Sequence, residues 1–492
     1  MKNTKIVTFI SINIAFFASA IWAQTPLPIF DKAGSHTIDA GAYDATGKSG
    51  FIDGYRKNIT VDVINGDTVE LFNAPSFILE SYGNYGSATD GGDVIFNGNL
   101  IAHAARSDYV YSPIMTNDGG SKLTINGNLT LDGTNTVNRA TWVHSYLVLS
   151  ENNVTTNLNG NVDLSMTTSN NLGTALGGGA VVFMGDNVLV NLGLDSDSNV
   201  HIHDMVSNAA WNAESYGIFG GEGDFTINVN GNLVIENIEA NTTSSFSGNY
   251  AHAAGIEAQE GTINVLADVT IRHISATGVN AEAYALAAYN NGTVNVNQGT
   301  NNIVKVEGIL IVANNGTINL NLTNSYSYFK GSMGKFFTGG EINLSLSNGG
   351  SWHIVEDSGV NNLVLDGGKL AFYADANDLG NMQKLILSNE SNISFVNNSE
   401  ISVILSNDFT EDEYMILLID TSFDPEYTIN TSFFTADFLD EFGNELENWH
   451  LIFVEGEGLY AYYAAIPEPA EAVALLGLIA IGFAAYKRRK NK

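Results

Sequence analysis

Residues 224–235, DFTINVNGNLVI, form a unit of which near-copies recur along most of the chain. Apolar and polar residues alternate on both sides of the Asn230-Gly231 pair. This alternation predicts two short, half-buried strands that meet at a corner. Because the unit recurs, we expect each strand to pair with its equivalent in the next copy, as the coils of a solenoid do.

The copies align on the polar residue that opens the second strand, and successive anchors lie 29 to 38 residues apart. A third apolar patch, such as residues 146–149, precedes the unit in several copies and predicts three strands per coil. Later copies shorten to 24 residues, the interval between Gly292, Gly316 and Gly340. We expect the variation in length to lie in loops. The anchors are Asn99, Asn128, Asn161, Asn199, Asn232, Asp268 and Asn302.

The composition favours a nearly all-β protein. Glycine is frequent (50 residues), proline is scarce (7) and only 15% of residues are charged, which suits many short strands better than helices. The repeated units resemble the right-handed parallel β-helix of bacterial surface proteins and autotransporter passengers, and this resemblance implies a right-handed parallel β-helix, or solenoid. One or more β-sandwiches are the alternative, since short strands with Gly/Asn turns fit them too.

Changes in this pattern divide the chain into segments. We predict an N-terminal lead-in or cap over residues 24–60, β-helix repeats over 61–380, and a C-terminal β cap over 381–465, where the strands lengthen and the loops become acidic. An open stack of strands needs such caps to protect its edges.

The net charge restricts the partners of the protein. The chain has 53 acidic and 20 basic residues, a formal charge of −33. Seven basic and two acidic residues lie in the end segments, which leaves a body of 51 acidic and 13 basic residues, near −38. Such a body repels phosphate backbones and anionic lipids, so we predict no nucleic-acid partner. Cations, basic surfaces or neutral glycans fit better.

The first residues are typical of a secretory signal. Lys2 and Lys5 precede a mostly apolar run over residues 6–17, and small residues follow up to Ala23, so we predict a signal peptide over residues 1–23. The chain contains no cysteine. An exported chain without disulfides must obtain its stability from its core.

The last residues combine three features in a fixed order: Pro467-Glu468-Pro469, an apolar run over residues 472–486, and a basic end that includes Arg488 and Arg489. A helix over the apolar run would span about 22 Å, which is short of the roughly 30 Å hydrocarbon core of a bilayer. The basic end would stay cytoplasmic. We predict one short C-terminal transmembrane helix; an ordinary tail anchor or a buried terminal helix is the alternative.

This tail, over residues 466–492, resembles the PEP-CTERM sorting signal. The resemblance implies that an exosortase-type processing enzyme in the inner membrane of a Gram-negative bacterium recognises the tail. The chain would be held transiently in that membrane and then released to the cell surface or the extracellular polysaccharide matrix. The sorting motif that it implies comprises Pro467, Glu468, Pro469, Arg488 and Arg489.

If the copies stack, the position four residues after each anchor forms a column with neighbours about 5 Å apart. His201 and His203 project from one face of a strand, and with Glu236 one coil away they could hold a divalent metal ion. A solvated polar face is the alternative that we favour, because loops of varying length could displace any of these residues. The column contains His103, Asp132, Ser165, His203, Glu236 and Arg272.

Other motifs predict no site. Residues 195–198, Asp-Ser-Asp-Ser, lack the remaining ligands of a calcium loop. Residues 47–49, Gly-Lys-Ser, follow alanine at position 42, where a phosphate loop needs glycine. The chain has no G-x-S-x-G elbow, H-E-x-x-H helix or cysteine nucleophile. We therefore predict no catalytic, metal-binding or cofactor-binding residues.

The sequence favours an exported surface or extracellular-matrix protein with a structural or adhesive role, and not an enzyme. The first alternative is a polysaccharide-degrading enzyme, a glycoside hydrolase or lyase, on the same scaffold; the second is a calcium-binding scaffold. An adhesin predicts a long regular face lined with Thr, Asn and aromatic residues. An enzyme predicts a groove with two carboxylates roughly 5 to 9.5 Å apart, or a basic residue beside acids.

Overall fold

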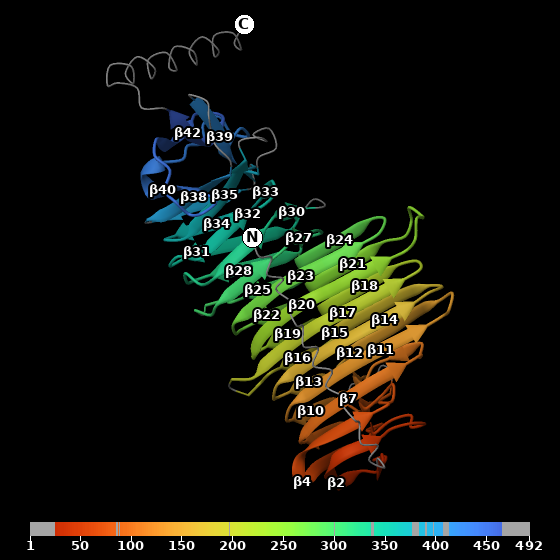
Figure 1. Cartoon of the computed structure of the whole chain (residues 1–492). Coiled ribbons are helices and arrows are strands. Elements are labelled where there is room, and N and C mark those ends of the chain that lie inside the picture. Colours follow the sequence, from red (N-terminus) through yellow and green to blue (C-terminus); the bar gives the residue numbers. More distant parts are fainter. Residues whose placement is uncertain are drawn as a thin grey trace, which may run out of the picture.

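The computed structural model of the protein describes residues 25–464, except 85–86, 88, 196, 300, 336–338, 376–382, 389–390, 397 and 407–412. It is an elongated stack of β coils (Figure 1). Almost every strand pairs in parallel with its equivalent in the next coil. This arrangement confirms the predicted all-β solenoid, and it excludes β-sandwiches, which pair their strands antiparallel.

Each coil contributes strands to three parallel series, as the third apolar patch predicted. The first series is β6 (Asp93–Asn97), β10 (Lys122–Asn126), β13 (Thr155–Leu158), β16 (Val188–Leu192), β19 (Phe225–Val229), β22 (Thr262–Val265), β25 (Thr293–Val296), β28 (Thr317–Leu322), β31 (Glu341–Ser347), β34 (Asn362–Asp366) and β37 (Asn392–Val396). The second series is β7 (Asn99–Arg106), β11 (Leu129–Val137), β14 (Val162–Asn170), β17 (Asn199–Ala209), β20 (Asn232–Thr242), β23 (Val269–Thr277), β26 (Val304–Glu307), β29 (Tyr328–Gly331), β32 (Ser351–Ile354), β35 (Lys369–Asp375), β38 (Ser399–Ser406) and β40 (Phe434–Asp440).

The third series is β3 (Ile52–Asp53), β5 (Leu79–Tyr82), β9 (Ile114–Asn117), β12 (Trp142–Glu151), β15 (Thr174–Met184), β18 (Ala213–Glu222), β21 (Ala251–Ala258), β24 (Ala281–Ala288), β27 (Leu310–Val312) and β30 (Met333–Lys335), with β8 (Val110–Tyr111) beside β12. At the N-terminal end β1 (Thr25–Pro26), β2 (Gly34–Asp44) and β4 (Asn58–Phe72) pair in parallel. The long strand β4 pairs with both β6 and β7, so it joins the first two series.

Among the named strands, antiparallel pairing occurs only in the C-terminal part of the described residues. A separate sheet contains β33 (Ser358–Gly359), β36 (Leu385–Ile386), β39 (Glu413–Asp420), β42 (Gly458–Ala464) and β41 (Trp449–Val454). Its last three strands are antiparallel, and η2 (Thr431–Phe433) is a short 3-10 turn beside it. Within residues 381–465, strand pairing therefore changes from coil stacking to an antiparallel end.

The described residues contain no helix that is long and apolar enough to cross a membrane. The predicted signal peptide and the predicted C-terminal transmembrane helix both lie outside the described residues.

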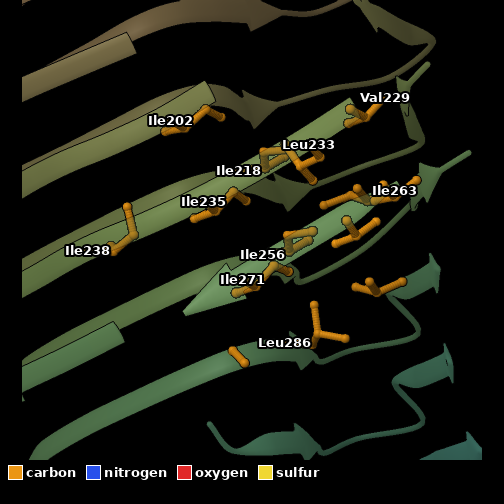
Figure 2. Packing of buried hydrophobic residues seen from close by; sticks show 14 of the residues in the cluster. Ile202, Ile218, Val229, Leu233, Ile235, Ile238, Ile256, Ile263, Ile271 and Leu286 are labelled. Carbon is orange, nitrogen blue, oxygen red and sulfur yellow. The ribbon is translucent and has the colours of Figure 1, made fainter. Parts of the chain in front are cut away.

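The core is a continuous column of apolar side chains inside the coils. Ile202, Ile235 and Ile271 occupy equivalent positions on β17, β20 and β23, and all three are fully buried. Figure 2 shows them in a row among the other buried side chains. Full burial of one such side chain contributes about 1.5–3 kcal/mol, so the repeated core stabilises the stack without disulfides.

The predicted anchor residues form a stack at one corner. The backbone N–H of Asn128 donates to Oδ1 of Asn99 at 2.8 Å, and the same contact joins Asn161 to Asn128 at 2.9 Å and Asn199 to Asn161 at 2.8 Å. The side chains of Asn99, Asn128 and Asn161 thus each satisfy a backbone donor of the next coil. The strand register confirms the alignment of the copies on the anchors from Asn99 to Asp268. The alignment is wrong by one residue at the last anchor, because Val269 pairs with Val304 and Asp268 therefore lies opposite Ile303 and not Asn302.

Two glycines of the 24-residue copies, Gly292 and Gly316, lie where adjacent coils approach closely. A methyl group added at Gly316 would lie 2.1 Å from the backbone oxygen of Ala288, and one added at Gly292 would lie 2.2 Å from that of Ala258. A side chain at either position must therefore push two coils apart.

We expect Gly316→Ala to lower the free energy of unfolding by about 1–3 kcal/mol, the range typical of overpacking. Thermal unfolding of the full chain measures this effect. Gly359→Ala is the matched control, because the nearest atom to the added methyl, the backbone oxygen of Ile386, is 3.9 Å away. Equal changes in the unfolding free energy of the two variants would mean that the close approach of the coils does not require glycine at position 316.

Candidate functional site

The predicted column of side chains exists for most of its length on the outer face of the second series. The register places His103 beside Asp132. Further along, His203 lies beside Glu236 and Glu236 beside Arg272. The stacking that was predicted from the anchors therefore brings these ionisable groups together.

A β-bulge interrupts the column between β14 and β17. The register shifts at this point, so that His203 and Asp204 together lie opposite Ser165. Asp204 has a left-handed backbone (φ 49°), as have Asn237 (φ 57°) and His273 (φ 56°) at the equivalent positions of β20 and β23. A bulge re-aims the side chains next to it. Here it turns two consecutive side chains, His203 and Asp204, outward.

Asp163 lies at the centre of the resulting cluster. Its Oδ1 is 3.2 Å from Nδ1 of His201 and 3.1 Å from Nε2 of His203. The two imidazole rings are stacked, with centroids 4.1 Å apart. All three side chains are partly exposed on the outer face.

The remaining ring nitrogens of the two histidines each contact a second carboxylate. Nε2 of His201 is 3.2 Å from Oε1 of Glu236, and Nδ1 of His203 is 2.8 Å from Oδ2 of Asp204. Arg272 donates to Glu236 from Nε at 2.8 Å and from a terminal nitrogen at 2.6 Å. The hydrogen bonds from Arg272 lower the pKa of Glu236, and the one from His203 lowers the pKa of Asp204.

His103 forms a different cluster in the same series. Its Nδ1 is 2.9 Å from both carboxylate oxygens of Asp132, and its Nε2 is 3.2 Å from Glu70. Burial alone would lower the pKa of His103, but the hydrogen bonds to the two carboxylates raise it. Because the acids contact opposite edges of the ring, this cluster has no single point that all three side chains could coordinate.

The outer face of the third series contains a buried ion pair that the sequence analysis did not predict. Nε2 of His252 lies 2.6 Å from Oε2 of Glu257, and Glu257 is only 1% exposed. Nε2 of Gln259 donates to its other oxygen at 3.0 Å. Burial alone would lower the pKa of His252, but Glu257 raises it to about 10.

Aromatic side chains surround this ion pair. The ring of His252 lies 5.6 Å from that of Tyr216 and 5.5 Å from that of Tyr284. Tyr216 also donates to Glu214 at 3.0 Å, and Glu214 is in register with His252. Outward-facing residues are buried here because the large side chains of adjacent coils cover one another.

Exposed aromatic residues lie at the corner that leads into the third series. Trp142 begins β12 and is 51% exposed, Trp211 precedes β18 and is 42% exposed, and Phe246 precedes β21 and is 70% exposed. Trp211 and Phe246 border a hollow of about 500 Å³. We call Trp142, Trp211 and Phe246 the aromatic corner.

A neutral polar face follows the first series. Each asparagine of a ladder donates through Nδ2 to Oδ1 of the asparagine one coil before it, at 2.5 to 3.0 Å. On the central coils a column of threonines runs beside it, from Thr226 to Thr317. The ladder comprises Asn157, Asn191, Asn228, Asn264, Asn295, Asn319, Asn343 and Asn362.

The remaining sequence motifs form turns or lie outside the described residues. Ser198 donates to the backbone oxygen of Asp195 from Oγ at 2.7 Å, which is local turn chemistry. The backbone N–H of Lys48 donates to Ala45 in another turn. The sorting motif over residues 467–469 and 488–489 lies outside the described residues.

Comparison of the chain with protein families, curated proteins and solved structures finds no match. Function must therefore be inferred from the chemistry of these faces.

Proposed function

We propose that the protein is an exported, surface or extracellular-matrix-associated, right-handed β-helix with a structural or adhesive role. The aromatic corner carries the adhesive part of this proposal. Exposed tryptophan and phenylalanine rings offer flat apolar surfaces beside polar groups. The body of the chain is acidic, with 51 acidic residues, but the same stack also presents a neutral face of Asn and Thr side chains. Neutral extracellular polysaccharide is the partner that suits both surfaces.

Delivery to the surface rests on the two ends of the sequence. A signal peptide over residues 1–23 would export the chain, and the helix over residues 472–486 would hold it transiently in the inner membrane. An exosortase-type enzyme would then process the tail at its Pro467-Glu468-Pro469 motif. Mass spectrometry of the surface-released protein tests this step: a mature chain that still carries Arg488 and Arg489 would contradict it.

We expect Trp142→Ala/Trp211→Ala to weaken binding of the full chain to its polysaccharide at least tenfold, because truncation of a tryptophan that anchors an interface commonly costs 2 kcal/mol or more. A glycan array identifies the ligand, and titration with that glycan measures the affinity. Tyr326→Ala is the matched control, because Tyr326 is an exposed aromatic residue (70%) elsewhere on the chain. Equal affinities for the double variant and the wild type would reject the aromatic corner as the binding surface.

A polysaccharide-degrading enzyme is the second candidate, and the ion pair of His252 and Glu257 favours it. A carboxylate buried beside a histidine is a recurrent arrangement in active sites. The enzyme hypothesis predicts that the full chain releases reducing sugar from the glycans it binds and that Glu257→Gln abolishes this release. We expect no release, since Glu257 is almost completely covered by its neighbours.

A further inference from the structure

Asp163, His201 and His203 bring one oxygen and two nitrogen ligand atoms together from two adjacent coils, β14 and β17. The three atoms all lie within 4.8 Å of one another. We propose that these residues form a binding site for a divalent transition-metal ion such as Zn²⁺. This inference is independent of the proposed adhesive function, because the site lies on the second series and not at the aromatic corner.

The spacing of the ligand atoms fits the coordination sphere of such an ion. Zinc binds imidazole nitrogen and carboxylate oxygen at about 2.0–2.2 Å in tetrahedral geometry, so neighbouring ligand atoms lie about 3.3 Å apart. Oδ1 of Asp163 is 3.2 Å from Nδ1 of His201 and 3.1 Å from Nε2 of His203. The two rings are stacked, 4.1 Å apart and inclined by 20°, so the imidazoles must rotate about their side-chain torsions before both nitrogen lone pairs point at one ion bound to Asp163.

The second contacts of the histidines are those that metal-bound histidines make. A ligating imidazole almost always donates its other N–H to a carboxylate or carbonyl, which fixes its tautomer and orientation. His201 makes this contact with Glu236, and His203 makes it with Asp204. Both carboxylates are themselves held, Glu236 by Arg272 and Asp204 by Asn237 at 2.9 Å. Both histidines of the cluster therefore have an outer-shell carboxylate.

The register shift at the β-bulge lies beside this cluster, at the step from β14 to β17. His201 pairs with Asp163, and His203 projects from the same face two residues later. The residue that the bulge adds, Asp204, contacts Nδ1 of His203. His103, in an unbulged part of the same series, has carboxylates on opposite ring edges. The residues around His103 thus form ion pairs and no common coordination point.

The ligand set selects the class of metal. Imidazole nitrogen suits Zn²⁺, Cu²⁺, Ni²⁺ and Fe²⁺, whereas Ca²⁺ and Mg²⁺ require a sphere of oxygen ligands. Three protein ligands leave one tetrahedral position on the partly exposed side for water or a group from a partner. Because the ligands come from β14 and β17, the bound ion would also link two coils and stabilise the stack.

Calorimetric titration of the full, untagged chain with Zn²⁺, in excess Mg²⁺ to occupy carboxylate-only sites, tests the proposal. We expect one site of micromolar or tighter affinity, and a rise in the melting temperature on Zn²⁺ binding. His203→Ala and Asp163→Asn each remove an inner ligand and should weaken binding at least tenfold. Glu236→Gln alters only the outer shell and should weaken it roughly tenfold.

His103→Ala is the matched control, because it removes an imidazole that contacts two carboxylates on the same series. It should bind Zn²⁺ as the wild type does. Circular dichroism verifies that each variant retains its β-structure, and Glu236→Gln keeps the test valid if an inner-ligand variant fails to fold. The proposal is overturned if the wild type binds no Zn²⁺, or if the folded Asp163 and Glu236 variants bind it with wild-type affinity.

Discussion

Glu257→Leu is expected to lower the free energy of unfolding by about 3–5 kcal/mol, the range typical of breaking a buried ion pair. The substitution leaves His252 covered by Tyr216 and Tyr284 without the carboxylate that it contacts at 2.6 Å. Chemical denaturation of the full chain at neutral pH measures the loss. Glu222→Leu, at the exposed end of β18, is the control and should change stability by less than about 0.5 kcal/mol.

The double variant His252→Leu/Glu257→Leu should recover much of this loss, because replacing both partners of a buried ion pair with apolar residues is often nearly neutral. A double variant as unstable as Glu257→Leu would show that the cost comes from packing and not from the lost charge beside His252, whose Nδ1 also lies 3.8 Å from Oε2 of Glu282.

The same pair predicts a pH dependence of stability. The pKa of His252 is about 10 in the folded chain and about 6.5 in the unfolded chain. A folded-state pKa that is raised in this way contributes stability that is fully present below about pH 6.5 and is lost as the pH rises toward 10. The difference in stability between the wild type and Glu257→Leu should therefore shrink between pH 7 and pH 10. A constant difference over this range would contradict the assignment of the charge to His252.

The stacking of the coils could be predicted from the sequence because both of its causes are local. Apolar residues alternate with period two, and the anchor asparagines from Asn99 to Asn232 bond one another in order. The interior is harder to predict where polar groups satisfy one another. Thr156 is fully buried in the first series, with hydrogen bonds to Ser150 at 2.7 Å and to Thr116 at 2.8 Å. An apolar pattern does not detect such a position.

The candidate sites could be predicted only in part. The column that contains His203 and Glu236 follows from the anchor spacing, but the bulge at Asp204 does not. The sequence analysis placed Glu236 with the two histidines, whereas Asp163 lies between them and Glu236 contacts the far nitrogen of His201. Asp163 and His201 each follow their anchor by two residues, so their pairing could have been predicted from the anchor spacing. Register shifts of one residue depend on backbone geometry that residue types do not encode individually.

The burial of Glu257 was unpredictable for a different reason. Its side chain projects outward from β21, on a face that solvent would cover if the neighbouring coils carried small residues. Tyr216 and Tyr284 on adjacent coils cover that face instead. The burial of Glu257 depends on side chains from three coils, so it can be predicted only when the register of those coils is known.

Trp352→Ala should lower the free energy of unfolding by about 3–5 kcal/mol, the cost of removing a large aromatic side chain from a packed core. Trp352 is fully buried on β32, stacks on Phe329 with ring centroids 5.8 Å apart, and donates from Nε1 to the backbone oxygen of Gly331 at 3.1 Å. The substitution therefore opens a cavity and removes the side-chain hydrogen bond to Gly331. Phe442→Ala, at an 81% exposed position, is the control and should be nearly neutral.

The loss should also be local, because each coil of a solenoid contacts only its neighbours. In hydrogen exchange on the Trp352→Ala variant, we expect the amides of β29, β32 and β35 to lose protection while those of β10, β13 and β16 retain it. An equal loss of protection along the whole stack would show that the coils unfold as one cooperative unit, and the free-energy cost of the cavity would then be shared by every coil.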